Sequence, residues 1–110
     1  MNHEARFDAT QYRIAPSVLE AIVRGTLSGE SRLRLPSGAT MKRTHPIEVR
    51  VKGAGCRVGL QLEALFGHEL PTLAAWVQCQ VAQSLNRMTG LDVEAVDVTF
   101  TGVFPAEPVE

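Results

Sequence analysis

The chain has 110 residues, of which 45% are hydrophobic and 21% charged, and its formal net charge is −1. This length fits one domain that is large enough to bury a core of its own. The near-neutral charge excludes a broad electrostatic field for polyanions or anionic lipid. The low aromatic content of 5% makes a base-stacking platform difficult to assemble.

The sequence contains no run of about 18 apolar residues, so we expect no transmembrane segment of its own. The polar N-terminus from Met1 to Gln11 lacks the apolar region of a signal peptide, which predicts a cytoplasmic location. Cys56 and Cys79 do not have the spacing of a metal site or a redox motif. We interpret both as free thiols in a reducing compartment.

The first part of the chain predicts an arm followed by an amphipathic helix. Residues 1–11 are polar and charged, and we expect a flexible N-terminal arm there. Pro16 suits the first turn of a helix, and Ser28-Gly29 is typical of a helix end. From Ala15 onward, apolar residues follow the i, i+3, i+4, i+7 spacing of one helical face. These residues are Ala15, Val18, Leu19, Ile22 and Val23.

The central part predicts strands. Residues 31–35 alternate as a short edge strand. Residues 47–52 and 57–65 alternate on either side of Gly53-Ala54-Gly55, which favours an antiparallel hairpin with one buried face. The expected buried residues of the second strand are Val58, Leu60, Leu62 and Ala64. On the outer side, the pattern predicts favourable cross-strand charge pairs between Glu48, Arg50 and Lys52 and the facing Arg57, Gln61 and Glu63.

The C-terminal part predicts a long helix and a strand. The helix covers residues 70–88, with Pro71 in its first turn and Gly90 as the left-handed residue that ends it. One arc of this helix is wide enough to form a core face. The arc contains Leu73, Ala74, Val77, Val81, Ser84, Leu85 and Met88. An alternating strand follows over residues 91–100, and we expect residues 103–110 to form a loose tail.

We therefore predict one domain over residues 12–102 with an α+β fold. Helices and strands alternate too little for a doubly wound sheet. Two helices packed on one face of a small, mostly antiparallel sheet of three to four strands bury all the apolar faces described above.

A series of motifs from Phe66 onward resembles the alkaline shock protein family, the envelope stress response family of bacteria. The shared features are an aromatic-Gly pair, a helix with a Val-Gln pair, a Thr-Gly-Leu turn and an alternating valine strand. Here these are Phe66-Gly67, Val77-Gln78, Val81, Met88-Thr89-Gly90-Leu91, Val93, Val96 and Val98. Residues 14–22 resemble the opening segment of the family, so the likeness covers residues 12–102. The chain departs from the pattern at Gly29-Glu30 and is more basic over residues 31–45.

The resemblance implies a non-enzymatic, cytoplasmic protein that works near the membrane in the response to envelope stress. It implies self-association and contact with a separate membrane-anchored protein. The role would be that of a scaffold or protein-interaction module. Because the family has no known catalytic residues, the resemblance supplies no catalytic residue and no cofactor.

The chemistry of the side chains also argues against an enzyme. His3, His45 and His68 stand apart from one another, and no metal-binding or phosphate-binding motif is present. A pair of Cys79 with His68 is conceivable, but we place Cys79 on the far face of the second helix, away from any base. We predict no catalytic site, no metal and no cofactor.

A small nucleic-acid-binding domain is the alternative function. Arg32, Arg34, Lys42 and Arg43 would supply a local basic patch. A KH-type module requires a GXXG loop between two helices, and no such loop is present. We prefer to interpret these residues as solvated charges and expect no nucleic-acid partner.

One flank of the second helix is the predicted interaction site. It carries Trp76, Gln80, Gln83 and Arg87. Trp and Arg are favoured at the centres of protein interfaces. The alternative interpretation is that Trp76 is covered by a loop of the chain itself or by the tail around Phe104. Exposed sheet edges are a second possible route to assembly.

Overall fold

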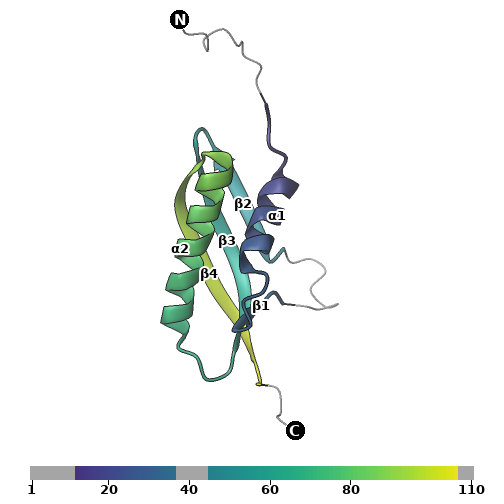
Figure 1. Ribbon diagram of the computed structural model, residues 1–110, viewed down its shortest axis with the longest axis vertical. Helices are drawn as coiled ribbons and strands as arrows, with labels where there is room; N and C mark the ends of the chain where they lie inside the picture. Colours follow the sequence, from purple (N-terminus) through teal and green to yellow (C-terminus); the bar gives the residue numbers. More distant parts are fainter. Residues whose placement is uncertain (1–11, 37–44, 107–110) are drawn as a thin grey trace, which may run out of the picture.

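The computed structural model describes residues 12–36 and 45–106. Two helices lie on one face of a four-stranded sheet, which confirms the predicted α+β fold (Figure 1). The elements are α1 (Pro16–Leu27), β1 (Leu33–Arg34), β2 (Ile47–Lys52), β3 (Gly55–Leu65), α2 (Leu70–Thr89) and β4 (Asp92–Phe104). The predicted arm over residues 1–11, the basic pair Lys42-Arg43 and the last four residues lie outside the described part.

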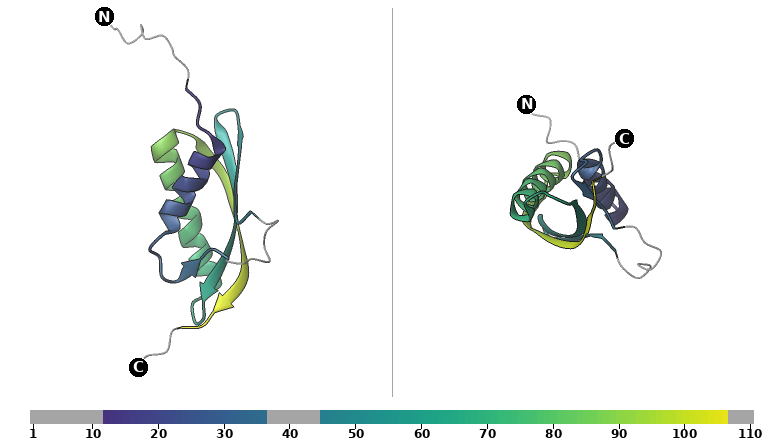
Figure 2. Two further views of the ribbon diagram at one scale, coloured as in Figure 1. Left: turned by 90° about the vertical axis from the view of Figure 1, so that its right-hand side faces the viewer. Right: turned by 90° about the horizontal axis from the view of Figure 1, so that it is seen from below.

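Strand β3 is the centre of the sheet. Strands β1 and β2 pair with different stretches of β3, both antiparallel, while β4 pairs with β3 in parallel over its whole length. Two of the three pairings are therefore antiparallel, as expected, although the longest is parallel. The parallel pairing follows from chain connectivity, because α2 carries the chain back along the sheet between β3 and β4. Figure 2 shows the sheet curving around the two helices.

The core lies between the helices and the inner face of the sheet. Every second residue of β3 is buried, as the alternation predicted, and each helix contributes one apolar stripe. The buried residues of β3 are Cys56, Val58, Leu60, Leu62 and Ala64, and those of the helices are Leu19, Val23, Leu27, Leu73, Val77, Val81 and Leu85. Helix α2 ends as predicted, with Gly90 at φ 80° and its N–H donating to the Asn86 carbonyl.

Three residues that the periodicity places on a core face of a helix are exposed, and one of them is Ala15, just before the first turn of α1. Val18 is 47% exposed and Met88 is 65% exposed. Both have the periodicity of a buried residue but lie near a helix end. The core stripe of α1 begins one residue later, at Leu19, and the stripe of α2 ends at Leu85. The periodicity gives the direction of a side chain and does not say how far the neighbouring elements extend.

Strand β4 is longer than predicted and continues to Phe104, past the expected end of the domain at residue 102. The backbone N–H of Phe66 donates to the Phe104 carbonyl at 2.8 Å, and the Arg34 guanidinium lies 4.2 Å from the centroid of the Phe104 ring. The end of β4 is thus held by the loop that follows β3 and by β1.

The cross-strand charge pairs expected on the hairpin do not form. The hairpin loop has two residues, because Lys52 pairs with Gly55, and this register places Arg50 directly opposite Arg57. Glu48 lies opposite Gly59 and contacts Arg50 of its own strand at 3.5 Å. Like charges directly opposite each other in a ladder are unfavourable, so the fold alone gives no reason for this arrangement.

Candidate interaction surface

Helix α2 is unusual for a helix on the protein surface because it carries a single charged residue, Arg87, in 20 residues. Its outward-facing residues include Ala75, Cys79, Gln83 and Asn86, all exposed. Exposed helix faces in globular proteins are typically charged or strongly polar. Depletion of charge is instead a compositional mark of the centres of protein interfaces.

A shallow groove runs between α1 and α2 on the outer side of the helical layer. Its volume is about 590 Å³. The residues that line it, here called the helical groove, are Ser17, Val18, Ala21, Ile22, Gly25, Thr26, Ser84, Arg87 and Met88. Two of the exposed core candidates, Val18 and Met88, thus lie in the same depression. A groove with exposed apolar side chains and one cation suits a largely apolar protein segment.

The floor of the helical groove is formed by small side chains of α1. Gly25 lies inside the helix, where glycine is destabilising by roughly 0.5–1 kcal/mol relative to alanine. A Cβ atom added at this position would meet no atom within 4 Å, and its φ is not positive. Neither internal packing nor backbone conformation therefore requires glycine here, although Gly25 lines the helical groove.

The four residues of the predicted flank of α2 do not share one environment. Trp76 and Gln80 are half-buried, while Gln83 and Arg87 are exposed. Only Arg87 among these four lines the helical groove. In the described part of the chain, no carboxylate lies within 4.0 Å of the Arg87 guanidinium. No described residue therefore neutralises the charge of Arg87.

Trp76 is covered by the segment that follows α1. The Arg32 guanidinium lies 5.5 Å from the centroid of the indole ring, and Trp76 packs against the hydrophobic core. Arg32 is held in turn by Glu30, whose carboxylate accepts a hydrogen bond from the Arg32 Nε at 2.8 Å. This bond lowers the pKa of the Glu30 carboxyl below its ordinary value, despite the opposing effect of burial. The covering loop that we weighed as an alternative for Trp76 is present.

Two of the four residues proposed for a basic patch are engaged in intramolecular contacts. Arg32 is bound to Glu30 and stacked on Trp76. Arg34 donates to the Glu63 carboxylate at 2.7 Å and stacks on Phe104. These pairings account for both arginines as structural residues and disfavour a nucleic-acid surface built on them.

Gln78 is a residue whose role the sequence did not reveal. Its side-chain amide donates to the main-chain carbonyl of Val96 at 3.1 Å, so α2 is tied to β4 outside the β3–β4 ladder. The Val-Gln pair of the family pattern is thereby explained, because Val77 is buried in the core while Gln78 bonds the edge strand. The occurrence of this Val-Gln pair in the family pattern is the sequence signal that could have indicated a defined position for Gln78.

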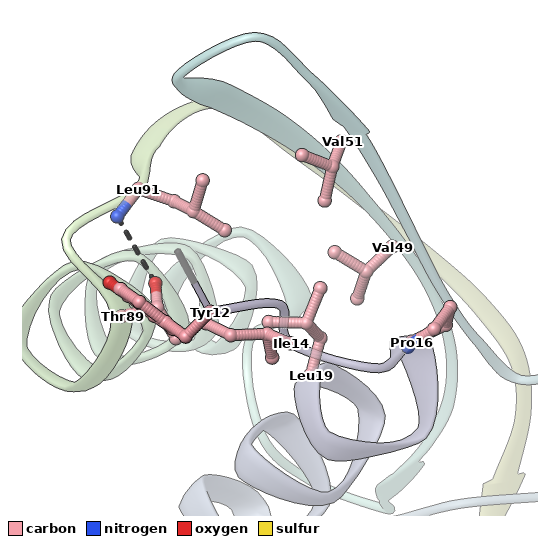
Figure 3. A pocket seen from close by; sticks show the side chains of 8 residues that line it. All are labelled: Tyr12, Ile14, Pro16, Leu19, Val49, Val51, Thr89 and Leu91. Carbon is pink, nitrogen blue, oxygen red and sulfur yellow. Dashed lines mark hydrogen bonds between the residues drawn. The ribbon is translucent and has the colours of Figure 1, made fainter. Parts of the chain in front are cut away.

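A second groove, of about 450 Å³, lies at the end of the molecule near the start of α1 (Figure 3). Its walls are mainly apolar and include Ile14, Leu19, Val49 and Leu91. The Thr89 hydroxyl is already bonded to the Leu85 carbonyl and to the Leu91 N–H. The described residues that line this groove therefore include no acid–base pair that could act in catalysis.

The cysteines and histidines do not form a site in the described part of the chain. Cys56 is buried, and burial raises the pKa of its thiol, which makes it a poor nucleophile at neutral pH. Cys79 is exposed, and its sulfur lies 3.5 Å from the Gln83 amide nitrogen. Across residues 12–36 and 45–106, no three His, Cys, Asp or Glu side chains are grouped as they would be around a metal ion.

The family model described as the alkaline shock protein 23 family, cell envelope-related function, matches residues 31–105. The chain belongs to this family. The match covers all four strands and α2, and begins after α1, so the likeness of residues 14–22 lies outside the matched part. Membership implies a function related to the cell envelope. No match was found among curated protein sequences.

Among solved structures, this alkaline shock family chain is similar to the metal-bound C-terminal domain of the CzcD transporter from Thermotoga maritima. The TM-score is 0.52 and the identity 14%, over 84% of this chain and 92% of that chain. At this identity the likeness concerns the fold alone. Neither described helix of the family member is long and apolar enough to cross a membrane.

Proposed function

We propose that this protein is a non-enzymatic interaction module of the envelope stress response. It self-associates and reaches the cytoplasmic membrane by binding a separate membrane-anchored protein. The observation that carries this proposal is the charge-depleted helical layer, in which the helical groove brings Val18 and Met88 together. The cell envelope-related function of the family supports the choice of partner.

The partner segment is defined by the chemistry of the helical groove. The exposed apolar side chains of Val18 and Met88 favour an apolar segment, and the small floor residues Ala21 and Gly25 permit close approach of its backbone. Arg87 at the rim favours a carboxylate on that segment. We therefore expect an amphipathic segment of the membrane-anchored protein, with one acidic residue facing Arg87.

The test is co-sedimentation of the purified chain with envelope membranes, in comparison with vesicles made from the lipids extracted from them. Ala21→Arg places a long cation on the groove floor, and we expect it to reduce membrane binding by about tenfold or more, as for truncated interface centres. Ala54→Arg adds the same charge at the exposed hairpin tip and is the matched control, with binding unchanged. Both variants should unfold at the same urea concentration as the wild type, because both positions are exposed.

Three outcomes would contradict the proposal. The first is equal binding of Ala21→Arg and wild type to membranes. The second is equal binding of the wild type to native membranes and to protein-free lipid vesicles, which would make lipid the partner. The third is retention of RNA or DNA with a steep salt dependence, which would favour the nucleic-acid alternative.

A further inference from the structure

The outer face of the sheet, opposite the helices, carries the remaining unexplained arrangement of charges. Here the outer sheet face means Glu48, Arg50, Arg57, Gly59 and Asp97. These residues surround a hollow of about 220 Å³. The four charged side chains are all exposed. Both described helices lie on the other side of the sheet (Figure 2).

The register of the sheet arranges these residues in two neighbouring rows of opposite charge. Arg50 and Arg57 are direct partners and form a cationic row. Glu48 pairs with Gly59, and Gly59 pairs with Asp97, so the second row has a carboxylate on each side of a glycine. Adjacent strands are about 4.8 Å apart, so the Cα atoms of Glu48 and Asp97 lie about 10 Å apart with Gly59 between them.

Gly59 has no internal reason to be glycine. It lies in the middle of the central strand, where glycine weakens a sheet and marks a bulge, a bend or the close approach of a ligand or another backbone. The two register shifts of the β3–β4 pair lie elsewhere, between Cys56 and Arg57 and between Leu62 and Glu63. A Cβ atom at residue 59 would meet nothing within 4 Å, and its φ is not positive. Close approach from outside is the reason that remains.

We propose that the outer sheet face binds the same face of a second copy around a two-fold axis. With the axis between the two rows and parallel to them, the cationic row of each copy lies over the anionic row of the other. Arg57 of each copy then enters the hollow at Gly59 of the other, between Glu48 and Asp97. Such a self-complementary contact is an isologous dimer interface.

This arrangement also explains the like-charged pair of the hairpin. Arg50 opposite Arg57 is unfavourable in an isolated copy, but two carboxylates of a second copy would neutralise the row. Arg57 and Asp97 form no ion pair with any described residue of their own chain. Exposed ion pairs contribute little individually, so we expect a weak dimer that dissociates when salt is raised.

The inference rests on the self-association that is part of the proposed function, and a charge-swap experiment tests it. Sedimentation equilibrium of the full chain should show a monomer–dimer equilibrium in the wild type. Arg57→Glu and Asp97→Lys should each weaken the dimer by at least about tenfold, since each homodimer would oppose like charges twice.

A mixture of the two variants should restore association. In the mixed dimer, the glutamate introduced in one variant faces the lysine introduced in the other, and the native Arg57 and Asp97 that the two variants retain face each other. Arg24→Glu, on α1, is the control and should dimerise normally.

Other results overturn the proposal. A monomeric wild type at low salt, unchanged dimerisation of Arg57→Glu, or no recovery in the mixture would each do so. Gly59→Leu is a second variant that fills the hollow, since a Cβ at this position meets no atom within 4 Å, and normal dimerisation of this variant would also count against the proposal. Failure of the dimer proposal is distinguishable from failure of the proposed binding in the helical groove. Ala21→Arg should dimerise normally while losing membrane binding.

Discussion

At the scale of single residues, the structure assigns Glu30, Arg32 and Arg34 to intramolecular contacts. Glu30 holds Arg32, and Arg32 covers Trp76, so three residues from separate sequence positions form one stack. The indole is therefore a reporter for the state of the loop that follows α1.

The pH dependence of this stack follows from the lowered pKa of Glu30. A carboxyl whose pKa is lower in the folded than in the unfolded state stabilises the fold at pH values above its unfolded-state pKa. This contribution is lost as the pH falls through its folded-state pKa. We expect Glu30→Gln to lower the free energy of unfolding by at most about 1 kcal/mol at pH 7, as for other partly exposed ion pairs. The difference in the free energy of unfolding between the variant and the wild type should decrease as the pH falls below 4.5, the ordinary pKa of a glutamate side chain.

Urea unfolding of both proteins between pH 7 and pH 3, followed by Trp76 fluorescence, measures this difference. Glu63→Gln is a useful comparison, since Glu63 pairs with Arg34, which stacks on Phe104. A gap between wild type and Glu30→Gln that stays constant down to pH 3 would show that the carboxylate charge has no part in holding the stack.

At the scale of elements, α1 and α2 differ from ordinary surface helices because they contain few charged residues. The two helices contain three charged residues, Glu20, Arg24 and Arg87. Gly25 further weakens α1 without any packing reason. We interpret the scarcity of charge and the presence of Gly25 as features that lower the stability of the helices but leave a groove of small and apolar residues.

Gly25→Ala tests that interpretation. The added methyl group meets no atom of the chain and reduces the backbone entropy of the unfolded state, so we expect the free energy of unfolding to rise by roughly 0.5–1 kcal/mol. Urea unfolding measures the change, and Gly90→Ala is the contrasting variant. Gly90 has a positive φ, so its replacement should destabilise the protein. A loss of stability in Gly25→Ala would mean that α1 packs more closely than the structure shows.

The helices and the hairpin could be predicted because periodicity and glycine-containing ends are local signals. The exposure of Met88 could not, because it depends on where the sheet and α1 end relative to α2. The position of Arg32 over Trp76 and the pairing of Arg50 with Arg57 depend on tertiary contacts and on hairpin register, which a single sequence does not specify. The charge depletion of α2 was visible in the sequence and is the signal that best identifies the candidate site.

At the scale of the whole molecule, the domain has two faces of opposite character. The helical layer is poor in charge and is grooved by small and apolar side chains. The outer sheet face carries alternating rows of charge around Gly59. We propose that the first face binds a membrane-anchored protein and the second a further copy of the chain, so that each dimer would carry two helical grooves.

The side chain of Met88 gives a direct measurement of the central claim, because it is 65% exposed in the free chain and lies in the helical groove. Hydroxyl-radical oxidation of Met88 should be several-fold slower when the chain is bound to envelope membranes than when it is free or mixed with protein-free vesicles of the same lipids. Phe66, 72% exposed at the opposite end of the molecule, should react equally in all three samples. Unchanged oxidation of Met88 in membrane-bound protein would contradict the account.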